Sequence, residues 1–265
     1  MNFSPGIGAT DELSLRVSVA TLVRVVFQHP VNREWMLALE RKATLHKDKV
    51  EVKSQPFGGA IRILDLDAIY ELIGDFHFDS EQSRFEQDFR LFIRPSSWPL
   101  LREFCIEHLS LVDDKVIETD PSRELIEEFT DALKVNLRPE QYVSTPVATI
   151  VENEAAPTEN FYAAGIPTVR VYRIFEAVIS DDALIYAVIK NSESISHNNL
   201  CTLALDDFQN GGKGWANAAL TLPLKNLSDH YLAMPPEERN TYFMFEKNRL
   251  DETISKVLDD IKVPK

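Results

Sequence analysis

The spacing of apolar residues predicts a sheet in the first third of the chain. Segment 22–29 (LVRVVFQH) is rich in β-branched residues, and segment 35–40 (WMLALE) follows it after a turn at 30–33. Two such runs joined by a short polar turn are typical of a β-hairpin. Further strand-like patterns lie at 50–53, 60–64 and 88–94.

Apolar residues at helical spacing predict two helices in the middle of the chain. Segment 97–109 begins with a serine and has a proline in its first turn, which suits a helix start. Segment 121–137 carries an apolar stripe that includes Leu125, Phe129 and Leu133, and Ser122 stands where a capping residue is expected.

The residue pattern in the remaining part of the chain predicts more strands and two helices near the C-terminus. Strand-like runs lie at 147–152, 168–179 and 183–190. Ser180, Asp181 and Asp182 join the last two runs and are typical of a hairpin turn. A loop is expected at 210–214 and helices at 224–232 and 251–261. The order predicts an α/β (α+β) fold in which a mixed β-sheet is sandwiched between helices.

The length and the absence of breaks favour one domain. The chain has 265 residues, 44% of them hydrophobic, which is enough for one large core or two small ones. No internal repeat or long linker is evident. We therefore expect a single elaborated domain over 15–265, preceded by a polar tail at 1–14.

The charge balance narrows the classes of partner. Asp and Glu number 42 against 28 Lys and Arg, which gives a formal net charge of −14. A protein that binds nucleic acid usually shows a basic face, so no nucleic-acid partner is expected. A small anionic substrate is compatible with this charge where a metal ion offsets it. No apolar run reaches the roughly 20 residues of a membrane helix, so we expect a cytoplasmic protein that does not contact a membrane.

Three glutamates on the helix at 121–137 are candidates for metal chemistry. Glu124, Glu127 and Glu128 stand at i, i+3 and i+4, which places three carboxylates on one face. A cation such as Mg²⁺ would offset their repulsion, and Arg123 could hold one carboxylate in place. The alternative is a solvated acidic face near a helix N-terminus, which is the commoner situation for such a triplet alone.

A glycine pair is the second candidate feature. Gly58 and Gly59 follow a predicted strand in the run Pro56-Phe57-Gly58-Gly59. Glycines allow positive φ angles or a close approach of the backbone to a ligand. An ordinary turn or bulge is the alternative explanation.

Together these features resemble the Nudix hydrolase family. The shared order is a hairpin, a Pro-x-Gly-Gly turn, a strand and a helix with Arg-Glu-Leu-Ile-Glu-Glu. The resemblance implies that Glu124, Glu127 and Glu128 bind Mg²⁺ or Mn²⁺ and act in catalysis with Arg123. It also implies that Gly58 and Gly59 shape the loop on the phosphate side.

The spacing around this helix departs from the family pattern. Leu109 and Lys115 stand where the signature has Gly and Glu, Thr130 replaces a later Gly, and residues 61–120 form an insertion. The order of motifs around the insertion is similar to Nudix domains associated with SMODS-type nucleotidyltransferases of bacterial nucleotide-signalled defence systems.

Other charged residues are candidates for the same site. Arg170 and Arg173 lie on one predicted strand and could contact phosphates, although arginines on a strand face are commonly structural. In Nudix enzymes a later loop often supplies a further ligand, and Glu152 or Glu154 could serve here.

The resemblance implies a metal-dependent hydrolase that cleaves the diphosphate of a nucleoside-diphosphate-linked substrate, in nucleotide signalling or bacterial defence. Its partner would be a small-molecule nucleotide. Many Nudix domains dimerise, so the resemblance is also compatible with a homodimer. Two alternatives stay open. One is a catalytically inactive Nudix-like module that binds a nucleotide or a protein, and the other is an interaction domain whose glutamates are merely solvated.

Overall fold

The computed structural model describes residues 12–46, 48–152, 154–157, 163–239 and 241–258. The chain divides into two compact units. Unit 1 consists of Met1–Thr21, Gly59–Asp120 and Ala148–Arg173, and unit 2 of Leu22–Gly58, Pro121–Val147 and Ile174–Lys265. Compactness alone does not identify an independently folding domain, so the single domain over 15–265 stays a prediction. Most of the tail expected at 1–14 lies outside the described residues, and Leu15 begins the first strand.

The sheet of unit 2 is built around strand β2 (Trp35–His46). The hairpin predicted at 22–40 is confirmed, because β1 (Leu15–Gln28) pairs antiparallel with β2. Strands β3 (Lys49–Gln55) and β9 (Trp215–Pro223) also pair antiparallel with β2. The hairpin of β10 (Phe243–Phe245) and β11 (Asn248–Leu250) joins through a parallel pairing of β11 with β3, so the sheet is mixed.

Helices α4 (Ser122–Leu133) and α5 (Asp182–Ser194) cover one face of β2. Side chains of a strand point alternately to the two faces of its sheet. Ala38 packs in a buried cluster with Phe129 of α4 and Val188 of α5. The stripe of α4 that was predicted from sequence therefore makes this core.

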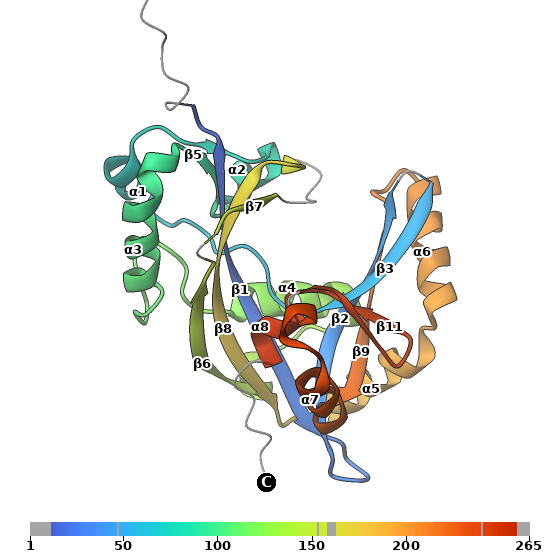
Figure 1. Cartoon of the computed structure of the whole chain (residues 1–265). Helices are drawn as coiled ribbons and strands as arrows, with labels where there is room; N and C mark the ends of the chain where they lie inside the picture. Colours follow the sequence, from blue (N-terminus) through green and yellow to red (C-terminus); the bar gives the residue numbers. More distant parts are fainter. Residues whose placement is uncertain (1–11, 47, 153, 158–162, 240, 259–265) are drawn as a thin grey trace, which may run out of the picture. The chain divides into compact units, whose positions relative to one another are not determined.

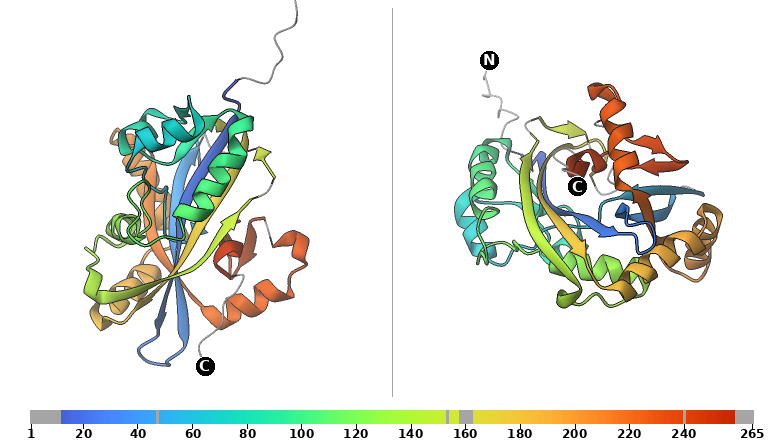
Figure 2. Two further views of the ribbon diagram at one scale, coloured as in Figure 1. Left: turned by 90° about the vertical axis from the view of Figure 1, so that its left-hand side faces the viewer. Right: turned by 90° about the horizontal axis from the view of Figure 1, so that it is seen from below.

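The other face of β2 is covered by α6 (His197–Gln209) and α7 (Leu224–Ala233). Leu37 and Leu39 pack with Leu227 of α7, while Ala43 packs with Leu200 of α6. Figure 1 shows α6 running along β9 and β3, and Figure 2 shows the same helices from two further directions. The predicted α/β class, with a mixed sheet between helices, is confirmed.

Unit 1 holds its own core. The first part of β1 pairs with β5 (Arg90–Ile93), which pairs with β4 (His77–Phe78). Helix α1 (Leu66–Ile73) lies against α3 (Trp98–His108), as Figure 1 shows, and both contribute to one buried apolar cluster. The other elements are α2 (Glu81–Glu86), β6 (Tyr142–Val151), β7 (Ala156–Pro157) and β8 (Pro167–Ile179); β6 and β8 continue into unit 2.

Several predicted elements are confirmed with shifted bounds, but two predicted strands and the turn before one of them are wrong. The run at 60–64 makes only isolated bridges such as Ala20 to Ala60. The run at 183–190 is not a strand but most of α5, and Asp181 caps that helix by accepting a hydrogen bond from the Leu184 N–H. The predicted hairpin turn at Ser180 to Asp182 is therefore a helix start.

The last described element of unit 2 is a short helix, α8 (Ile254–Leu258), inside the segment predicted at 251–261. Residues 259–261 of that prediction lie outside the described residues. Short 3-10 turns lie at Pro95–Ser97, Pro139–Gln141 and Pro236–Glu238. Within the described residues, no helix combines the length and the apolar character needed to cross a bilayer.

Candidate functional site

Helix α4 carries the candidate glutamates and is fixed by its apolar face. Leu125 and Phe129 are buried, and the rings of Phe129 and Phe57 have centroids 4.6 Å apart. This contact joins α4 to the turn that contains Gly58. The helix thereby brings two separate sequence motifs together in unit 2.

The start of α4 differs from the expectation. Pro121 occupies the capping position, and no side chain caps the helix there. Ser122 is the first helical residue, and its hydroxyl oxygen accepts a hydrogen bond from the Tyr142 hydroxyl at 2.9 Å. The prediction of Ser122 as the capping residue is therefore wrong. Lys134, in the left-handed region, ends the helix before the predicted end at 137.

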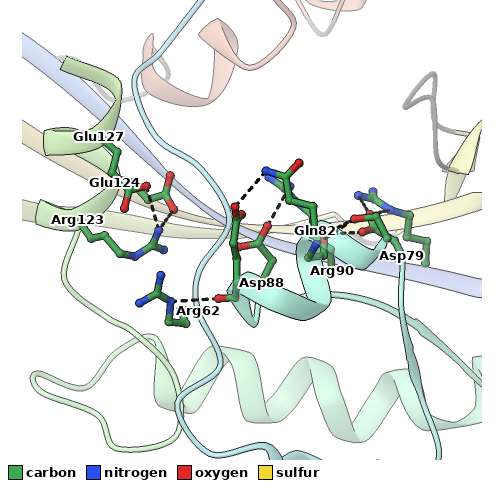
Figure 3. Close-up of polar contacts among 12 residues, drawn as sticks. Arg62, Asp79, Gln82, Asp88, Arg90, Arg123, Glu124 and Glu127 are labelled. Atoms are coloured by element: carbon green, nitrogen blue, oxygen red, sulfur yellow. Dashed lines mark hydrogen bonds and ion pairs between the residues drawn. The ribbon is translucent and has the colours of Figure 1, made fainter. Parts of the chain in front are cut away.

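Arg123 pairs with two of the three candidate glutamates. Its Nη1 lies 2.6 Å from Glu124 Oε1 and 3.4 Å from Glu127 Oε2. Figure 3 shows the guanidinium turned toward both carboxylates. The Glu124 side chain is 12% exposed and that of Glu127 is 58% exposed, so the two carboxylates differ sharply in their access to water.

Glu128 faces the glycine turn. The N–H of Gly58 donates a hydrogen bond to Glu128 Oε2. Gly58 has φ 134°, a backbone conformation that side chains other than glycine rarely adopt. The glycine therefore places a backbone donor against a carboxylate of α4. Gly59 belongs to unit 1, where its carbonyl accepts a hydrogen bond from the Thr21 N–H at 2.9 Å.

Glu40 is a further buried acid on this side of β2, and sequence reasoning missed it. It is 1% exposed, and its Oε2 accepts a hydrogen bond from Gln55 Nε2 at 2.9 Å. Burial raises the pKa of Glu40. Enclosure also raises the pKa of Glu128 well above its ordinary value, and the negative charge of Glu40 raises it further.

A signal for Glu40 was present in the sequence. Apolar residues fill positions of both parities around it, at Leu37, Ala38 and Leu39. Such a strand is buried on both faces, so a glutamate within it is expected to be buried too. The local pattern does not reveal that Glu40 lies beside Glu128, because the whole insertion at 61–120 separates the two in the sequence.

The two candidate arginines lie in unit 1. Arg170 Nη1 donates to Glu152 Oε2 at 3.2 Å, and Arg173 Nη1 donates to Thr149 Oγ1 at 3.0 Å. Burial lowers the pKa of Arg173. Glu154 is exposed. Contact of these residues with a phosphate stays a prediction.

The donor chemistry of the α4 site suits a hard divalent cation, since carboxylate oxygens are the ligands that Mg²⁺ prefers. Glu40 is buried and Glu128 is half-buried, and both carry raised pKa values, which a bound cation would lower. Across the residues that the structure describes, no three or more His, Cys, Asp or Glu side chains are already arranged to hold a metal.

Comparison with known proteins does not assign a family. No family model matches the chain, and no curated protein matches it. Among solved structures, the chain is similar to the NUDIX domain of Shewanella oneidensis NrtR in complex with ADP ribose. The identity is 9%, 68% of each chain is covered, and the TM-score is 0.27. A likeness this remote carries no weight for fold or function.

Proposed function

We propose that this chain is a metal-dependent hydrolase that cleaves the diphosphate of a nucleoside-diphosphate-linked substrate. The observation that supports it is the pair of neighbouring acids with raised pKa values, Glu128 of α4 and Glu40 of β2, beside the turn that contains Gly58. Glu40 is not among the residues that the resemblance to Nudix hydrolases implies, nor is it part of the glutamate triplet on α4.

The free-energy cost of placing two carboxylates close together and partly out of water favours a bound cation. A carboxylate removed from water is destabilised, and a second carboxylate nearby adds repulsion. Glu128 experiences both effects. Glu128, Glu40 and Glu124 would hold Mg²⁺ or Mn²⁺, with Glu127 on the solvent side. When bound, the ion polarises phosphate oxygens and lowers the pKa of a bound water.

Two contacts of the chain prepare the acids for this role. The Gly58 N–H fixes one oxygen of Glu128, and Arg123 fixes Glu124. Carboxylates oriented by neighbouring donors lose less freedom when a ligand binds. The same Arg123 neutralises part of the charge of the cluster while no cation is bound.

A catalytically inactive module that binds a nucleotide is the second candidate. Arg123 is paired with both Glu124 and Glu127, which occupies two of the three acids that the resemblance assigns to the metal. The departures from the family spacing at Leu109, Lys115 and Thr130 point the same way.

Turnover and binding separate the two candidates. The wild-type chain and Glu128→Gln are incubated with nucleoside diphosphate sugars, ADP-ribose among them, in Mg²⁺ or Mn²⁺, and products are measured by chromatography. Glu193→Gln, an exposed acid on α5, is the matched control. A hydrolase loses metal-dependent turnover in Glu128→Gln alone. A binding module shows nucleotide binding by calorimetry without turnover, and the absence of both rejects the two candidates together.

A further inference from the structure

A cavity lies on the other face of the sheet of unit 2. It has a volume of about 240 Å³ and is lined by residues from β2, β3, α6 and the β10–β11 hairpin. Its polar and charged lining includes Arg41, Ser54, His197, Lys247 and Arg249. Arg41 follows Glu40 on β2, so the two side chains point to opposite faces and the cavity is separate from the α4 site.

Arg41 and Ser54 are adjacent members of the cavity lining. They are cross-strand neighbours on β2 and β3. Arg41 is 7% exposed and Ser54 is fully buried. Arg41 Nη2 donates to the Ile195 carbonyl, yet Arg41 Nε and Ser54 Oγ are buried without a hydrogen-bond partner. A buried donor without a partner is costly, so both groups favour a ligand that accepts hydrogen bonds.

The charge around the cavity is positive, against a net charge of −14 for the chain. Among the described carboxylates none forms an ion pair with Arg41 or Lys247. Burial lowers the pKa of Arg41, as expected for a guanidinium without a countercharge. Arg249, which also lines the cavity, forms an ion pair with Glu51, whose Oε2 lies 3.9 Å from Arg249 Nη1.

Helix α6 adds to this field. It has 13 residues and begins at His197, which lines the cavity, after the capping residue Ser196. The N-terminus of a helix carries a partial positive charge that favours anions. The helix end supplements the buried Arg41 and Ser54, which provide directed donors.

We propose that this cavity binds the phosphate group of a small phosphorylated molecule. A guanidinium offers paired N–H donors to a tetrahedral oxyanion, and a serine hydroxyl adds another. The bound phosphate would give Arg41 the countercharge that it lacks and would pair the orphan donors. The cavity volume exceeds that of a phosphate alone, so the rest of the molecule also has room. This inference does not depend on the proposed hydrolase activity.

Calorimetric titration with inorganic phosphate tests the proposal. The buffer contains EDTA, so that metal-bridged binding at Glu128 cannot contribute, and sodium acetate at equal ionic strength is the comparison anion. We expect binding of phosphate to the wild type that is about tenfold weaker or more in Arg41→Gln, which corresponds to the loss of about 1.4 kcal/mol or more.

Two further variants guard against misfolding of Arg41→Gln. Ser54→Ala removes a hydroxyl that has no partner, and Lys247→Asn removes a charge at a residue with φ 68°, where Asn is well tolerated. Both should bind phosphate several-fold more weakly, while the exposed control Lys190→Gln on α5 binds like the wild type. Absence of phosphate binding to the wild type, equal affinity in all variants, or equal binding of acetate would overturn the proposal.

Discussion

At the scale of single residues, the neighbouring acids Glu40 and Glu128 are the central groups of the α4 site. Each is a carboxyl whose pKa is raised by burial, and for Glu128 the charge of Glu40 contributes as well. A folded state with raised carboxyl pKa values binds more protons than the unfolded chain. The contribution to stability is therefore complete below the ordinary carboxyl pKa and is lost as the pH rises through the raised values.

Glu128→Gln should consequently stabilise the metal-free protein at alkaline pH. The amide oxygen can still accept the hydrogen bond from the Gly58 N–H, while the charge of the half-buried carboxylate is removed. We expect the free energy of unfolding at pH 8 to rise by about 1 kcal/mol or more, with little change at pH 4. Urea denaturation in EDTA at both pH values measures this. A variant that is less stable than the wild type at pH 8, with Glu193→Gln unchanged, contradicts the assignment.

Gly58 gives a second prediction at this scale. Gly58→Ala should destabilise the chain by about 1–3 kcal/mol, because φ 134° is strained for alanine. A shift of the backbone would also displace the N–H that contacts Glu128. Thermal denaturation measures the loss. An unchanged melting temperature would show that this turn does not require glycine.

At the scale of elements, an ion pair connects β1, β8 and α8 within unit 2. Arg24 Nη2 lies 2.7 Å from Glu176 Oε2, and Arg24 Nη1 donates to the Val257 carbonyl at 3.1 Å. Glu176 interrupts the apolar strand β8, and the buried Arg24 is its partner there.

Glu176→Gln should destabilise the packing of these elements. It leaves Arg24, which is 6% exposed, without a countercharge. Since the Glu176 side chain is 30% exposed, we expect a loss of about 1–3 kcal/mol, below the full cost of breaking a buried pair. Urea denaturation measures it. The double variant Arg24→Met/Glu176→Leu should recover most of the loss, and failure of the single variant to lower stability would contradict this role.

Some helices and strands could be predicted from the sequence and others could not. The β-hairpin and α4 were predictable because their apolar periods are long and regular. The segment 183–190 was misassigned because its apolar residues suit a strand as well as a helix, and the capping role of Asp181 decided the outcome. Asn191 then fixes α5 by donating to the Ala132 carbonyl and accepting from the Ala219 N–H, contacts between distant segments that no local pattern reveals.

At the scale of the whole molecule, the chain is acidic, yet it contains two regions of opposite charge. One is the acidic α4 site, and the other is the cavity lined by Arg41. The glutamates of α4 were found in the sequence because they share one helix, whereas Glu40 joins them only through the fold. Arg41 and Ser54 become neighbours through strand pairing, and His197 reaches them from a helix that the sequence did not predict. Local spacing thus predicted the glutamates of α4, but it did not predict Glu40 on β2.

The most direct test of the α4 site is calorimetric titration of the purified protein with Mg²⁺ and with Mn²⁺. Wild type, Glu128→Gln, Glu40→Gln and the control Glu193→Gln are compared, without and with a nucleoside diphosphate. Our account predicts binding to the wild type and to the control, and its loss in both Glu128→Gln and Glu40→Gln. Metal binding that is equal in all four proteins, or absent from the wild type under both conditions, would contradict it.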